Sequence, residues 1–151
     1  MVGLKKEKMK QMLHYIIHKC QNKSNFGRTV LYKLMYFSDF NNYEIYEELI
    51  TNEDYVKRHR GPIPVNFDSY SHELEDEGKI FKKDNPIHTP TEILNQIHYY
   101  SNSTPETNLL NNNELNVIDS VIDKLSNMTA REISEYSHGD KPWRVAETIK
   151  N

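Results

Sequence analysis

The sequence has few of the residues that form cross-links or phosphate-binding loops. Its 151 residues include one cysteine and five glycines. Because Cys20 is alone, no disulfide can form within the chain, and we expect a reducing compartment. There is no glycine-rich loop and no Walker pattern, so phosphate binding of that kind is not indicated. We expect no cofactor.

Long hydrophobic runs and a large excess of one charge are also absent. The most apolar stretch, Thr29 to Phe40, is interrupted by Lys33, Ser38 and Asp39, whereas a membrane-spanning helix needs about 20 apolar residues. The net charge of −3 and pI near 6.2 argue against attraction of the whole surface to nucleic acid or anionic lipid. The opening MVGLKKEK lacks the apolar segment of a secretion signal. We expect a cytoplasmic protein that does not enter the membrane.

The composition that remains is typical of a globular domain. Hydrophobic residues make up 36% and charged residues 27% of the chain, unlike a disordered tail. A chain of this length buries roughly 70% of its unfolded surface, enough for one core. No linker or internal repeat divides it, so we predict a single domain over residues 1–151.

The stretch from Thr29 to Phe40 is the predicted centre of that domain. Its apolar residues occupy two faces of the expected helix: Leu31, Leu34 and Met35 on one, and Tyr32, Tyr36, Phe40 and Tyr43 on the other. A helix that is apolar on more than one face is usually buried between other elements. We predict that it runs from Gly27 to about Glu47, with Ser24 or Asn25 as its cap.

Three further helices are predicted from apolar residues recurring every three to four positions, over residues 4–20, 65–76 and 114–126. The pattern of a Thr followed three residues later by a Glu predicts a capping box and another helix at residues 129–132. The fold class is therefore mainly α with a small β-sheet (α+β), compact around the central helix.

The expected strands are short. One covers residues 55–59 and is followed by a rigid loop at Gly61-Pro62-Ile63-Pro64, because each proline fixes its own φ and restricts the residue before it. Two more are expected at 79–82 and 96–100. The stretch 83–113 is longer than an ordinary connection, so we expect it to contain further structure.

No residue pattern assembles an active site. Cys20 lies on the apolar side of the first helix and is expected to pack as a small hydrophobe. Ser137 and His138 are adjacent, and adjacent side chains rarely point at one another, so a capped turn is favoured over a catalytic pair. A hydrolase using Asp39 with His138 stays an open alternative, because pairing of distant residues is not visible in sequence.

A zinc site is not favoured either. His14 and His18 have the spacing that places two imidazoles on one helical face, but Tyr15 stands where zinc proteases have a glutamate. A structural zinc site would need more ligands than the chain supplies with one cysteine. We expect histidines at the surface or at the edge of the core, and no metal.

Three features are candidate binding elements. The basic run Lys57-Arg58-His59-Arg60, beside Tyr55, can meet a phosphate backbone or an acidic protein, or can guard an edge strand against aggregation. Asp39 is expected on a solvent-facing strip or paired with a basic residue, because an unpaired buried carboxylate is costly. Trp143 either anchors the last helix on the core or belongs to a binding surface.

Three stretches in this order resemble a known family. Leu31-Tyr-Lys-Leu-Met-Tyr-Phe-Ser-Asp-Phe40 is similar to its K-L-L-Y-F-A-D-F helix, and Gly61-Pro62-Ile63-Pro64 is similar to its Y-G-P-V-P. Ser137-His138-Gly139-Asp140-Lys141-Pro142-Trp143 resembles its S-H-x-x-x-x-W signature. The chain from about Met9 to Val145 thus resembles the Panacea domain of the SocA-like antitoxin family, often encoded in prophages and toxin–antitoxin loci.

The resemblance implies a mostly helical, non-enzymatic protein that binds and neutralises a cognate toxin, or delivers it to a host protease. The expected partner-binding residues are Asp39, Tyr55, Lys57, Arg58, Arg60, His138 and Trp143. The expected structural positions are Gly61, Pro62, Pro64, Ser137 and Pro142. The alternative is a prophage-encoded adaptor or regulator that contacts a host protein or DNA, although the negative net charge disfavours nucleic acid.

Overall fold

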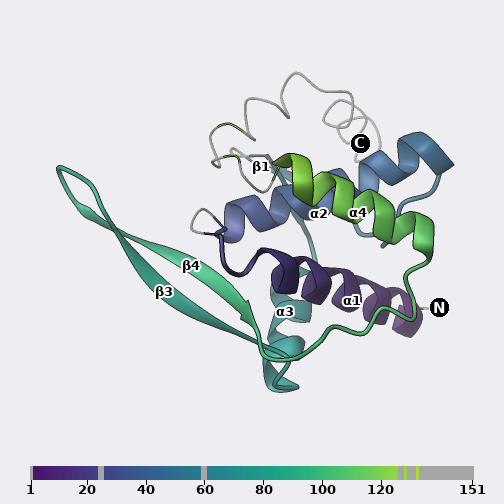
Figure 1. Cartoon of the computed structure of the whole chain (residues 1–151), viewed down its shortest axis with the longest axis horizontal. Helices are drawn as coiled ribbons and strands as arrows, with labels where there is room; N and C mark the ends of the chain where they lie inside the picture. Colours follow the sequence, from purple (N-terminus) through teal and green to yellow (C-terminus); the bar gives the residue numbers. More distant parts are fainter. Residues whose placement is uncertain (1, 24–25, 59–60, 126–127, 129–131, 133–151) are drawn as a thin grey trace.

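The structure, a computed structural model, describes residues 2–23, 26–58, 61–125, 128 and 132. Its elements in chain order are α1 (Val2–Cys20), α2 (Arg28–Tyr46), β1 (Tyr55–Arg58), β2 (Gly61–Pro64), α3 (Phe67–Asp76), β3 (Ile80–His88), β4 (Ile93–Ser101) and α4 (Asn112–Leu125). The strands form two separate two-stranded antiparallel sheets, and the helices form the body (Figure 1). The predicted α+β class is confirmed. None of the described helices is long and apolar enough to cross a membrane.

Helix α2 is the centre of the body, as its sequence predicts. It contacts α1, α4, β2 and β4. From Val30 to Phe40 every side chain is buried except the half-buried Tyr32. Both faces of the helix are therefore covered, and the buried set includes the polar residues Lys33 and Asp39.

The start of α2 differs from the prediction. Its N-cap is Gly27, which makes no side-chain cap bond, whereas Ser24 and Asn25 lie outside the described residues. A Cβ on Gly27 would lie 2.6 Å from Nε2 of Gln96 on β4. The Gln96 side chain of β4 thus packs closely on Gly27, and glycine is also a favoured residue at an N-cap.

Strands β1 and β2 form a short hairpin against α2. They pair from Tyr55 opposite Pro64 to Arg58 opposite Gly61. The strand predicted over 55–59 is confirmed for its described residues, 55–58, but the rigid loop predicted for residues 61–64 is wrong, since this segment is β2. The φ of proline suits an extended backbone, and each strand of a two-stranded sheet has one edge where a missing N–H costs nothing.

The stretch 83–113 supplies most of a long hairpin. Strands β3 and β4 pair from Ile80 opposite Ser101 to His88 opposite Ile93. This ribbon, called the β3–β4 arm below, extends away from the helical body (Figure 1). The strands predicted at 79–82 and 96–100 are confirmed but cover only its base, and the expected additional structure is present.

Tyr99 anchors the β3–β4 arm to the body. Its side chain is buried, and its ring meets the Phe67 ring of α3 edge to face with centroids 5.7 Å apart. Arg28 at the start of α2 donates a 3.0 Å hydrogen bond to the Tyr99 hydroxyl. On the opposite face of the ribbon, Phe81 and Tyr100 stack across the two strands at 5.1 Å. Such cross-strand pairs stabilise an antiparallel ribbon.

The two histidines of α1 lie against the base of this arm. A ring nitrogen of His14 and one of His18 each lie 3.0 Å from the Ser101 hydroxyl oxygen. His18 is exposed, but His14 is buried. The surface or boundary position expected for His14 is therefore wrong, because β4 packs against this part of α1.

Helix α4 is the amphipathic helix that the periodicity predicts. Its buried apolar residues are Val117, Ile118, Val121, Ile122 and Leu125. The helix begins with a reciprocal cap: Asn111 Oδ1 accepts the Glu114 N–H at 2.8 Å, and the Asn111 N–H donates to Glu114 Oε1 at 2.9 Å. Glu114 also pairs with Lys8 of α1 at 2.7 Å. The capping box predicted at residues 129–132 includes positions outside the described residues.

Asn111 allows a test of how much this cap contributes. Replacing it with alanine removes the bond to the Glu114 N–H, and we expect the free energy of unfolding to fall by about 1 kcal/mol in urea titrations. The matched control is Asn113→Ala in the exposed first turn of α4. It is expected to change stability by less than about 0.5 kcal/mol. Equal losses in the two variants would contradict the assigned cap.

Candidate functional site

Asp39, the most buried acid among the described residues, organises the region where the first two family-like motifs meet. Its side chain, 0% exposed, accepts three hydrogen bonds. The Thr51 N–H donates at 2.9 Å, the Thr51 hydroxyl at 2.7 Å and the Tyr55 hydroxyl at 2.5 Å. The expectation of a solvent-facing Asp39, or one paired with a basic residue, is therefore wrong. Neutral donors satisfy its carboxylate.

Burial dominates the protonation behaviour of this group. It raises the pKa of Asp39 to about 6, although the hydrogen bonds from Thr51 and Tyr55 oppose the shift. Burial together with the Asp39 charge also raises the pKa of Tyr55 well above its ordinary value. Tyr55 therefore remains a hydrogen-bond donor, and the three residues join the middle of α2 to the start of β1.

A second buried acid, Glu53, closes the open end of the same hairpin. Glu53 accepts the backbone N–H of Asn66 at 2.8 Å and its side-chain amide at 2.8 Å. The Glu53 N–H in turn donates to the Thr51 hydroxyl oxygen at 3.1 Å. Residues before β1 and after β2 are thus tied together, and the hairpin has a fixed position on α2. Thr51 and Glu53 belong to no pattern that sequence reasoning identified.

A cavity of about 340 Å³ lies between this hairpin and α2. The described residues that line it are Thr29, Tyr32 and Lys33 of α2, and Arg58, Gly61, Pro62 and Ile63 of the hairpin. We call it the Lys33 pocket. Its volume falls in the range of sites that take a small molecule or a large side chain. It is formed by two of the three family-like motifs.

Lys33 is the unusual member of this lining, because its side chain is only 1% exposed. Burial lowers the pKa of Lys33 to about 8, so the amino group stays largely protonated near neutral pH. Gly61 has φ of +122°, and a Cβ there would collide with the Lys33 amino nitrogen. The glycine thus makes room for the buried cation. The available sequence signal was a lysine within a helix otherwise predicted to be buried.

The structure separates the predicted binding residues into three groups. Lys57 and Arg58 are exposed on β1. Asp39 and Tyr55 are buried, so neither offers a surface contact, and both position the hairpin instead. Arg60, Ser137, His138, Pro142 and Trp143 lie outside the described residues. The structural positions Pro62 and Pro64 are buried in β2.

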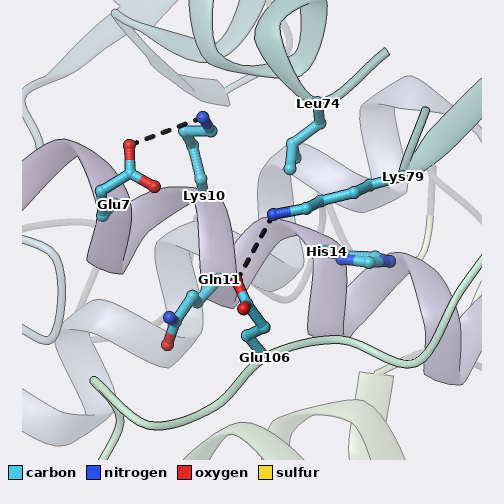
Figure 2. Close-up of a pocket in the computed structure, with 7 residues that line it drawn as sticks. All are labelled: Glu7, Lys10, Gln11, His14, Leu74, Lys79 and Glu106. Atoms are coloured by element: carbon cyan, nitrogen blue, oxygen red, sulfur yellow. Dashed lines mark hydrogen bonds and ion pairs between the residues drawn. The ribbon is translucent and has the colours of Figure 1, made fainter. Parts of the chain in front are cut away.

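A second hollow lies between α1 and α3, and side chains fill almost all of it. Figure 2 shows its lining, where Lys10 faces Glu7 and Lys79 faces Glu106. The Lys10 amino group lies 2.6 Å from a carboxylate oxygen of Glu77 and 3.5 Å from one of Glu7, and Lys79 lies 3.4 Å from Glu106. The volume of about 10 Å³ holds a single water at most. The pair of Lys10 with Glu77 attaches the end of α3 to α1, and the small volume leaves no room for a ligand.

Of the groups considered for catalysis, Ser137 and His138 lie outside the described residues, so the pairing of Asp39 with His138 stays a prediction. Cys20 is buried, and burial raises the pKa of its thiol to about 12, which keeps it protonated. No three histidine, cysteine, aspartate or glutamate residues within the described ranges are grouped as metal ligands. The arrangement around the Lys33 pocket suits binding, since it offers an apolar cavity beside fixed positive charge.

Asp39 gives the site a measurable pH signature. Its pKa of about 6, above the ordinary 3.8, means that the folded protein binds this proton more tightly than the unfolded chain. The contribution of Asp39 to stability therefore grows as pH falls. We expect the stability of the wild type relative to Asp39→Asn to increase by about 1–2 kcal/mol from about pH 7.5 to about pH 5 in urea titrations.

The two Asp39 variants separate charge from hydrogen bonding. In Asp39→Asn, the amide can accept from the Thr51 N–H and donate to the two hydroxyl oxygens. Asp39→Ala leaves these donors without their acceptor, and we expect it to be destabilised at both pH values. A constant difference between the wild type and Asp39→Asn across this pH range would contradict the assignment.

Gly61 is the residue whose replacement should disturb the Lys33 pocket most directly. Gly61→Ala combines a left-handed φ with a collision with Lys33, so we expect a loss of about 1–3 kcal/mol in thermal or urea unfolding. Gly3→Ala is the matched control, because nothing lies within 4 Å of a Cβ at that position. A loss of equal size in the control would show that the strain at Gly61 is not the cause.

Residues 31–144 match the family model described as antitoxin SocA-like, Panacea domain. The match includes Lys33, Asp39 and the whole β1–β2 hairpin, so the Lys33 pocket lies almost entirely within it. No curated protein and no solved structure matches the chain significantly. The match covers most of the chain and confirms the resemblance of its motifs. The chain belongs to the SocA-like antitoxin family, with a Panacea domain.

Proposed function

We propose that this chain is the antitoxin of a type II toxin–antitoxin system. It acts in the cytoplasm, without enzymatic activity of its own, and neutralises a cognate toxin by direct protein–protein binding. The observation that carries the proposal is the match of residues 31–144 to an antitoxin family. Family membership supports the antitoxin role, while direct binding of the toxin is our inference.

The surface around the β1–β2 hairpin supports a binding mechanism. Protein interfaces commonly have an apolar centre with polar residues around it, and a few anchors carry most of the energy. The Lys33 pocket supplies a concave apolar centre, and the exposed Lys57 and Arg58 lie on the adjoining strand. The Asp39 and Glu53 hydrogen bonds hold this surface in place, which reduces the ordering cost of association.

Binding can neutralise a toxin in two ways. The antitoxin can cover the active surface of the toxin, or it can carry the bound toxin to a host protease. Both routes require the same first contact, so the proposal includes protease delivery as a second step. The routes differ in the fate of the toxin, which persists in an equimolar complex in the first and disappears in the second.

An adaptor or regulator encoded by a prophage is the alternative function. Lys57 and Arg58 favour it, because exposed basic residues on a strand can contact DNA or an acidic host protein. The net charge of −3 weighs against the DNA version. Filter-binding measurements distinguish a regulator that binds DNA from an adaptor that binds a host protein, since DNA binding would weaken steeply as salt increases.

The growth assay tests the antitoxin proposal directly. We expect the product of the adjacent gene to arrest growth when it is expressed alone. Co-expression with this chain should restore growth, because the toxin is then held in a complex. Co-purification through a tag on either protein should recover that complex.

The control is the same plasmid with a stop codon early in the gene for this chain, which should give no rescue. A neighbouring gene product that is harmless alone would contradict the proposal. Rescue with falling toxin levels, abolished in protease-deficient cells, would assign neutralisation to delivery. Rescue with constant toxin levels and a recovered complex would assign it to occlusion.

A further inference from the structure

We propose that the Lys33 pocket is the recognition site for an acidic segment of the partner protein. In this arrangement an apolar side chain of the segment enters the pocket, and a neighbouring carboxylate pairs with the exposed Arg58 at its rim, while the buried charge of Lys33 adds attraction from within the wall. The identification of that partner as the toxin rests on the proposed function. The chemistry of the pocket follows from its residues alone.

The size and walls of the pocket suit the apolar side chain of the proposed segment. Its volume of about 340 Å³ exceeds that of any single side chain but is small for a folded element. The ring of Tyr32 and the apolar residues Pro62 and Ile63 line it. A large aliphatic or aromatic side chain entering there would leave water and gain contact with these walls.

The charges of the lining favour a carboxylate beside that apolar side chain. Lys33 and Arg58 are its charged members, and the described lining residues include no acid. Lys33 is shielded from water, so its charge acts in a low-dielectric region where attraction to a carboxylate is stronger than at an open surface. Arg58 is exposed and can form a bidentate pair with a carboxylate.

The two sides of the pocket are held before any partner arrives. On the hairpin side, Tyr55 is fixed by its hydrogen bond to Asp39, and Asn66 is fixed by Glu53. On the helix side, Lys33 lies in the middle of the buried α2. A site that needs little reorganisation retains more of its contact energy as affinity.

The chemistry is tested first with a small probe on the full chain. Anilinonaphthalene sulfonate has an aromatic body and an anionic group, whereas phenyl-naphthylamine has a similar body without the charge. In fluorescence titrations we expect the wild type to bind the sulfonate at least about tenfold more tightly than the neutral dye. Lys33→Met and Arg58→Gln should each reduce this preference while still binding the neutral dye.

Lys82→Met on the β3–β4 arm is the matched control, because it removes an exposed lysine away from the pocket. It should keep the preference of the wild type. Circular dichroism and thermal unfolding establish that each variant is folded. Arg58→Gln changes an exposed side chain, so the test remains decisive if Lys33→Met does not fold.

The second arm uses the toxin. Arg58→Glu reverses a charge at the pocket, and we expect it to weaken binding of the co-purifying toxin at least about tenfold and to impair rescue of growth. Ile63→Arg fills the apolar wall with a bulky cation and should have a similar effect. Lys82→Glu is the control with the same charge reversal and should retain rescue.

Each outcome has a distinct meaning. If the wild type shows no preference for the anionic dye, or the two charge variants keep it, the inferred pocket chemistry is overturned while the antitoxin role is unaffected. If the preference is present but Arg58→Glu and Ile63→Arg bind the toxin normally, the pocket serves a small anionic ligand and the protein segment is overturned. A harmless neighbouring gene product would overturn the proposed function alone.

Discussion

The carboxylate of Asp39 lies in the middle of a helix that is buried on both faces, and it has no contact with water. Donors from Thr51 and Tyr55 make this position tolerable, because a buried carboxylate without partners would be costly. Those two residues precede and begin β1, so satisfying the charge also determines where the hairpin lies. The position of the Lys33 pocket follows, since one of its sides is that hairpin.

Two charged residues of α2, Lys33 and Asp39, are thus both buried but have different roles. The Asp39 hydrogen bonds are internal and join parts of the chain. Lys33 instead lies at the wall of a cavity, where burial lowers its pKa to about 8 and the backbone of Gly61 comes close. Proteins commonly lose stability at the residues with which they bind and catalyse. A shielded cation at an apolar cavity has the character of such a residue.

The sequence predictions succeeded where they depend on residues close together in the chain, and failed where they depend on contacts between distant residues. The periodicity that indicated α2 and α4 depends on residues three or four positions apart, and both helices are present. Residues 61–64 were misassigned because proline restricts φ equally in a loop and in an extended strand. Asp39 was misplaced because its donors lie 12 and 16 positions away. The β3–β4 arm was only partly found, since its register depends on pairing between distant residues.

The sequence by itself determined the helical body, the central place of α2 and the family. Local periodicity and short motifs can be recognised without knowing the long-range contacts. The tertiary structure alone decided which motifs meet. It brought Lys33 of α2 close to Gly61 and into one pocket lining with Arg58 of the hairpin. It also formed the hydrogen bond from the Asn66 N–H to Glu53. Such contacts join residues far apart in the chain, and the free energy that selects them comes from burial and hydrogen bonding in the folded state. No local pattern encodes that free energy, so the Lys33 pocket became visible only in the fold.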